Sequence, residues 1–130
     1  MTYLLDVNAL LALAHAAHVH HGRMEVWVRS LSRRDRLATC AITELGFVRI
    51  APQVRLSPDV AAARELLSVL RGNRRRPFVR LSDELGADSL PSWVRTPAQT
   101  TDGHLVALAA ARDARLATLD EAIPDAVRVP

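Results

Sequence analysis

Residues 2–13 read T-Y-L-L-D-V-N-A-L-L-A-L, and this stretch decides the fold. Residues 2–6 predict a strand that is apolar enough to lie at the centre of a sheet. Residues 7–15 predict a helix that is apolar almost all round. Asp6 stands between the two, where a carboxylate that closes a buried strand is costly without a partner. We therefore expect Asp6 to have a function or a partner.

Outward from this stretch, apolar runs of strand length alternate with longer segments of helical period, which favours an α/β fold with a parallel sheet and helices on both faces. We expect further strands at residues 36–39, 78–81 and 115–119, and a short fifth strand at 126–129. We expect helices at residues 20–33 and 42–50, a helix that starts at Ser57-Pro58-Asp59 and ends at Gly72, a short helix at 83–86, and a helix capped by Thr100 or Thr101. The sheet of four or five strands would belong to one domain over residues 1–130.

The composition is that of a globular protein, since 49% of the 130 residues are hydrophobic and 24% are charged. No segment resembles a signal peptide or has the apolar length of a membrane span, so we expect a soluble, cytoplasmic protein without a membrane partner. Cys40 is the only cysteine, which excludes an internal disulfide and a cysteine-based zinc site. We expect Cys40 to be a buried structural thiol.

All seventeen basic residues are arginines, and the formal net charge is +3. If four of the fourteen acids gather at a metal site, the seventeen arginines and ten remaining acids leave a surface of +7, which would attract nucleic acid. The same balance also arises from genome composition and solubility alone. A turn rich in arginine is a candidate RNA-binding site, with a solvated loop as the alternative; its residues are Arg71, Arg74, Arg75 and Arg76.

Four acids are expected at one edge of the sheet. Asp6 ends the first strand and Asp120 follows the fourth, while Glu44 and Asp102 lie in the first turns of two helices. The carboxyl ends of parallel strands open to the same edge. Carboxylates so close together repel one another unless a cation lies between them, and oxygen ligands suit Mg²⁺ or Mn²⁺. The pattern predicts metal-dependent hydrolysis of a phosphodiester, although each acid alone could be a cap or a surface residue.

Four segments in this order resemble the successive motifs of PIN-domain VapC toxins: L-L-D-V-N-A-L-L-A-L at 4–13, T-E-L at 43–45, T-D-G-H-L-V-A-L-A at 101–109 and L-A-T-L-D at 116–120. The resemblance implies a PIN-like three-layer sandwich and a Mg²⁺-dependent endoribonuclease that a VapB-like antitoxin neutralises. It implies that Asp6 and Asp102 are the principal metal ligands, that Glu44 and Asp120 complete the catalytic set, and that the cluster is supported by Asn8 and Thr118. Gly103 departs from the more common alanine, which we expect to loosen the helix start without removing a ligand.

Other functions remain open at this stage. An aspartyl-phosphate phosphatase or receiver domain would need an active-site lysine, and the chain has none. A catalytically inactive PIN-like module that binds RNA or a partner is the second alternative. The histidines at positions 15, 18, 20 and 21 suggest a transition-metal site, with solvated loop and cap residues as the commoner explanation. We also expect a homodimer, because the apolar helical surface exceeds what one small sheet covers.

Overall fold

The structure is a computed structural model that describes residues 1–130, and its centre is one parallel sheet. The strands are β1 (Thr2–Leu5), β2 (Arg36–Thr39), β3 (Phe78–Arg80), β4 (Ala114–Thr118) and β5 (Val127–Arg128). Their order across the sheet is β3-β2-β1-β4-β5, and every neighbouring pair is parallel. The first strand of the chain is therefore central, and the strand ends that precede the expected acids open to one edge.

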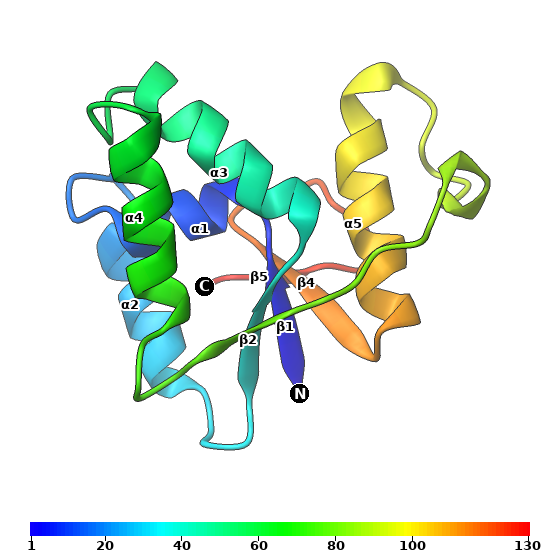
Figure 1. The fold of residues 1–130 in the computed structure, drawn as a ribbon. Coiled ribbons are helices and arrows are strands. Elements are labelled where there is room, and N and C mark those ends of the chain that lie inside the picture. Colours follow the sequence, from blue (N-terminus) through cyan, green and yellow to red (C-terminus); the bar gives the residue numbers. More distant parts are fainter.

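Five α-helices cover the two faces of this sheet. They are α1 (Val7–Ala14), α2 (His21–Ser30), α3 (Ala41–Gln53), α4 (Val60–Arg71) and α5 (Thr100–Ala111). Figure 1 shows α1 to α4 gathered on one side of the strands and α5 on the other. The predicted α/β sandwich of three layers is confirmed. None of these helices has both the length and the apolar character that crossing a membrane requires.

Alternation along the strands divides the core into two clusters. Leu5 on β1 packs in a cluster that also contains Leu37, Met24 and Phe47, on the side of α1 to α4. Leu4, one residue earlier, packs with Leu116 and with the buried residues of α5. Successive strand residues point to opposite faces of a sheet, so a strand buried on both faces must be apolar throughout. This is why β1 reads as a continuous apolar run.

Two helices begin at caps other than those expected. Asp59 caps α4 by accepting a hydrogen bond from the Ala62 backbone N–H at 2.8 Å, so the helix starts at Val60. Ser57 is instead buried and bonded elsewhere. Before α5, Thr96 caps a short 3₁₀ helix (Pro97–Gln99) that leads directly into the helix. The prediction that Thr100 or Thr101 caps α5 was therefore wrong, because the capping box lies one turn earlier.

Other differences concern where helices end and whether one expected helix is present. α3 continues through Pro52 to Gln53. A proline so close to a helix end removes only one backbone donor, so it does not stop α3 where we expected. α2 ends at Ser30, three residues before the expected end. The short helix expected at 83–86 is absent, and a 3₁₀ turn lies at Ala87–Ser89 instead.

Candidate functional site

Asp6 lies at the centre of the carboxyl edge of the sheet. It follows β1 and is only 7% exposed. Its Oδ1 accepts a hydrogen bond from the Ala9 backbone N–H at 2.8 Å and so caps α1, while its Oδ2 accepts one from the Thr118 hydroxyl. Two of the four lone-pair positions of the carboxylate remain free for a further ligand.

Thr118 connects Asp6 to Asp120. Leu5 pairs with Ala117 across β1 and β4, so the next residues of the two strands also lie side by side. The buried Thr118 hydroxyl donates to Asp6 and accepts a hydrogen bond from the Asp120 backbone N–H at 3.0 Å. Asp120 is exposed, and its Oδ1 accepts from the Ala122 backbone N–H at 2.8 Å. One hydroxyl thus fixes the spacing between two of the predicted acids.

Asp102 completes a group of three interacting acids. It lies half-buried in the first turn of α5, as expected. Burial raises the pKa of Asp102, and the charge of Asp120 raises it further. Burial also raises the pKa of Asp6, in part offset by the hydrogen bonds from Thr118 and Ala9, and the charges of Asp102 and Asp120 add to the increase. Burial is the larger cause of both increases, and repulsion among the carboxylates adds to it.

The three acids provide donors for a divalent cation. No three histidine, cysteine, aspartate or glutamate side chains meet as a finished metal site in the structure. Mg²⁺ keeps several of its waters, however, and is usually bound through one or two carboxylates, so direct contact among three of them is not required. The oxygen donors and the repulsion that a cation would relieve therefore fit Mg²⁺ or Mn²⁺.

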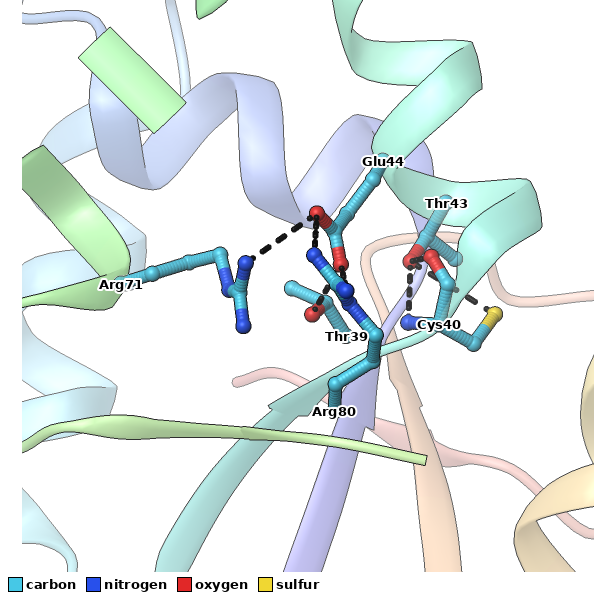
Figure 2. A network of polar contacts seen from close by, with 6 residues as sticks. All are labelled: Thr39, Cys40, Thr43, Glu44, Arg71 and Arg80. Atoms are coloured by element: carbon cyan, nitrogen blue, oxygen red, sulfur yellow. Dashed lines mark hydrogen bonds and ion pairs between the residues drawn. The ribbon is translucent and has the colours of Figure 1, made fainter. Parts of the chain in front are cut away.

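Glu44 lies at the same edge but is engaged by arginines, as Figure 2 shows. Arg80 donates two hydrogen bonds to its carboxylate, Nε to Oε2 at 2.8 Å and Nη2 to Oε1 at 3.0 Å, and Arg71 Nη1 lies 3.4 Å from Oε1. The Thr39 hydroxyl donates to Oε2 at 2.9 Å. Although burial raises it, these contacts together hold the pKa of Glu44 below its usual range. A role for Glu44 as metal ligand stays a prediction, since it would have to leave both arginines.

The start of α3 explains why Glu44 lies where it does. The Cys40 backbone N–H donates to the Thr43 hydroxyl at 3.0 Å, and that hydroxyl donates back to the Cys40 carbonyl at 3.1 Å. Cys40 is fully buried, which confirms the structural thiol. The cap fixes the first turn of α3 at the end of β2, so Glu44 is held one strand away from Asp6.

The arginine-rich turn has three different surroundings. Arg71 lies at the carboxyl edge with Glu44, whereas Arg76 donates to the backbone carbonyls of the loop at residues 31–35. Arg74 and Arg75 are exposed. The four do not form one surface, and their binding of RNA stays a prediction. Asn8 is exposed in the first turn of α1, and its supporting role is likewise untested.

The histidines do not form a metal site. The buried His15 uses one ring nitrogen on the Leu11 carbonyl at 2.9 Å and the other on the Ser57 hydroxyl at 2.9 Å. The ring of His18 lies 5.8 Å from that of His20, and its Nδ1 accepts from the His20 backbone N–H. His21 bonds the Ala12 carbonyl. These contacts fix the α1–α2 connection and account for the cluster.

Gly103 has a role in packing that the sequence did not indicate. A Cβ atom on the buried Gly103 would lie 2.2 Å from Val94 Cγ2, so glycine permits close packing of the segment before α5 rather than merely loosening the helix. Arg80 was not selected from the sequence as a residue of the site. It ends β3, and the carboxyl ends of parallel strands open to the same edge whether the residue there is acidic or basic.

The sequence of this chain is similar to those of known proteins. The family model described as "PIN domain" matches residues 3–129. The chain is 42% identical to Ribonuclease VapC44 of Mycobacterium tuberculosis over 129 residues, which are 95% of this chain and 89% of the relative. It is 39% identical to Ribonuclease VapC38 of the same organism over 123 residues, which are 92% of this chain and 86% of that relative.

Two solved structures show the same fold. M. tuberculosis VapC20, described as a sarcin-ricin loop cleaving toxin, superposes with a TM-score of 0.64 at 13% identity, covering 93% of this chain and 92% of that chain. VapBC2 from Rickettsia felis, solved bound to a DNA fragment from its promoter, superposes with a TM-score of 0.53 at 15% identity, covering 98% and 97%.

Proposed function

Since this chain belongs to the PIN-domain family, and within it to the VapC ribonucleases, we propose that it is the RNA-cleaving toxin of a VapBC-type pair and that Asp6, Asp102 and Asp120 hold a divalent metal ion. Glu44 is the fourth candidate. The observation that carries the proposal is the placement of acids from three separate parts of the chain at one edge of the sheet: Asp6 follows β1, Asp120 follows β4, and Asp102 lies in the first turn of α5. Mg²⁺ is the ion we expect, and Mn²⁺ accepts the same oxygens.

The chain's own residues would prepare the site for hydrolysis of a phosphodiester. A bound divalent ion supplies an activated water and stabilises charge at the phosphoryl group. Thr118 and the Ala9 amide hold the Asp6 carboxylate in one orientation. No hydrogen bond within the chain engages the Asp102 carboxylate, so its oxygens remain available. An aspartyl-phosphate mechanism has no support, because the chain lacks the lysine that it needs.

Cleavage of total cellular RNA with Mg²⁺ and with EDTA tests this proposal. We expect cleavage with Mg²⁺ only, and none by Asp102→Asn; Asp88→Asn, an exposed acid outside the cluster, is the matched control. Independently of activity, Mg²⁺ should raise the melting temperature of the wild type and of Asp88→Asn but not of Asp102→Asn. Equal cleavage in EDTA would falsify metal dependence, and a fully active Asp102→Asn would remove this residue from the site.

Two partners complete the proposal. A VapB-like antitoxin would block the acids, and co-purification with the product of an adjacent gene tests this. A homodimer is supported by exposed apolar side chains on α3 and the start of α4, where Leu45 is 71% and Val60 52% exposed beside a hollow of about 780 Å³. Sedimentation that shows only monomer at micromolar concentration would contradict the dimer.

A further inference from the structure

The starts of β2 and β3 border a hollow of about 450 Å³ that none of the proposed chemistry uses. Four arginines and a single acid line it, and Pro77 with the first two residues of β3 forms the rest of its wall; the charged residues are Arg33, Arg36, Arg75, Arg76 and Asp35. The proposed metal-binding acids lie beyond the other ends of the strands. At about 3.3 Å per residue, the four residues of β2 separate the two edges by about 13 Å.

The acid in this hollow does not neutralise the arginines. Asp35 Oδ2 accepts from the Ser32 backbone N–H at 2.8 Å, and its Oδ1 lies 3.2 Å from the amino-terminal ammonium group. Arg76 is also committed, since it donates to the carbonyls of Leu31, Ser32 and Asp35. Arg76 nevertheless forms no ion pair with a carboxylate, so these hydrogen bonds hold its guanidinium in place without neutralising its charge.

The other three arginines are free to bind a ligand. Arg33, Arg36 and Arg75 are exposed, and their guanidinium groups make no hydrogen bond or ion pair within the chain, in contrast to Arg71, Arg80 and Arg128. One guanidinium group can donate two parallel hydrogen bonds to two oxygens of a phosphate. Free guanidinium groups around one concave surface therefore suit phosphate groups. The uncompensated charge favours a polyanion over a neutral ligand.

We propose that this hollow, the arginine hollow, is a second phosphate-binding site for the RNA, several nucleotides from the bond that is cleaved. The proposal rests on the proposed ribonuclease function for the identity of the polyanion. Because the hollow and the acids lie at opposite edges of the sheet, a very short RNA reaches only one of them. A longer RNA contacts both, so the hollow raises affinity without taking part in the chemistry.

The test compares two triple variants that each lose three exposed, unpaired arginines. The first is Arg33→Gln, Arg36→Gln and Arg75→Gln. The matched control changes arginines outside the hollow, namely Arg55→Gln, Arg95→Gln and Arg115→Gln. Equal unfolding free energies in urea show that both variants fold. The substrates are a 30-nucleotide and a 4-nucleotide RNA, both centred on a cleavage site mapped in total cellular RNA.

With the 30-nucleotide RNA we expect the KM of the hollow variant to rise about tenfold or more, with kcat unchanged, while the control changes by less than about threefold. The slope of log affinity against log salt should fall by about 2 to 3 for the hollow variant, one unit for each lost phosphate contact. With the 4-nucleotide RNA both variants should match the wild type. Similar KM values for the two variants with the long RNA would overturn the proposal.

A binding measurement in the Asp102→Asn background separates this inference from the proposed function. If the wild type cleaves no RNA, the ribonuclease assignment fails, yet a labelled 30-nucleotide RNA of arbitrary sequence still reports whether the hollow variant binds more weakly than the control. If RNA affinity is equal in the two variants but an acidic peptide loses affinity for the hollow variant, the hollow serves a protein partner and the RNA site is refuted.

Discussion

Arg80 and Glu44 are joined by two parallel hydrogen bonds, Nε to Oε2 at 2.8 Å and Nη2 to Oε1 at 3.0 Å. Paired bonds between a guanidinium and a carboxylate fix distance and orientation together. The pair links the end of β3 to the first turn of α3, and Arg71 adds a contact from α4. The Glu44 carboxylate on α3 therefore binds arginines from both β3 and α4. Arg80, in contrast, projects towards solvent with 55% of its side chain exposed.

Glu44→Gln should lower the unfolding free energy by about 1–3 kcal/mol, because the half-buried Arg71 loses its charged partner. Arg80→Gln should cost less than Glu44→Gln, since solvent screens an exposed ion pair. Urea unfolding at pH 7 measures both, with Glu65→Gln on the exposed face of α4 as the control. A Glu44→Gln variant as stable as the control would show that the network contributes nothing to folding.

Thr118→Val should lower the unfolding free energy by about 1–3 kcal/mol, because the buried Asp6 carboxylate loses a hydrogen bond and the Asp120 amide loses its acceptor. Cleavage should fall as well, since Asp6 is then free to turn. Thr118→Ser keeps the hydroxyl and should retain most of both properties. If Ser and Val variants behave alike, the hydroxyl is not what positions Asp6.

Gly103→Ala should destabilise the fold by about 1–3 kcal/mol, because the added Cβ overlaps with Val94. Helix propensity alone predicts the opposite sign, a gain of about 1 kcal/mol, so the direction decides between the two effects. In a Val94→Ala background the same substitution should become neutral or stabilising. The double-mutant cycle in urea isolates this contact, and an unchanged cost in that background would exclude it.

Asp35 should make part of the stability depend on acid pH. The hydrogen bond from Ser32, followed by the amino-terminal ammonium group, holds the pKa of Asp35 below its usual value. A lowered pKa stabilises the folded state above the unfolded pKa of about 3.9. The stability gap between wild type and Asp35→Asn should therefore be constant from pH 7 to about 5 and shrink as the pH falls further. A gap that grows on acidification would contradict the assignment; Asp88→Asn controls for the lost charge.

Asp102→Asn should be more stable than the wild type in EDTA, because the variant no longer buries a charged carboxylate and no longer repels Asp120. Adding Mg²⁺ should reduce the difference in stability between the two proteins or reverse its sign, since only the wild type gains binding energy from the ion. Thermal melts of both proteins make the comparison, without MgCl₂ and with MgCl₂ at a concentration on the order of 5 mM. An Asn variant that is less stable in EDTA would show that Asp102 has a favourable partner within the chain.

The sequence predicted the features that depend on pattern along the chain. Alternating strands and helices placed Asp6 at the end of a central strand, and the edge rule for parallel sheets brought Asp102 and Asp120 near it. Contacts between distant side chains were not predictable in this way. The sequence around Glu44 does not indicate that Arg80, thirty-six residues later, donates hydrogen bonds to its carboxylate.

Local signals also failed where a tertiary contact overrode them. Ser57 has the sequence context of a helix cap, yet its hydroxyl bonds the buried ring of His15, and Asp59 caps α4 instead. The same competition explains Gly103, where close packing against Val94 outweighs helix propensity. In each case the partner lies outside the window in which capping and propensity rules operate.

The Thr118 hydroxyl that joins Asp6 to Asp120 spans 112 residues of sequence. During synthesis Asp6 emerges from the ribosome 112 residues before Thr118, and Asp120 emerges after Thr118. A nascent chain that still lacks them carries an unbraced carboxylate and only part of the acidic group. Any catalytic power of these acids consequently begins only after β4 has been translated and has paired with β1.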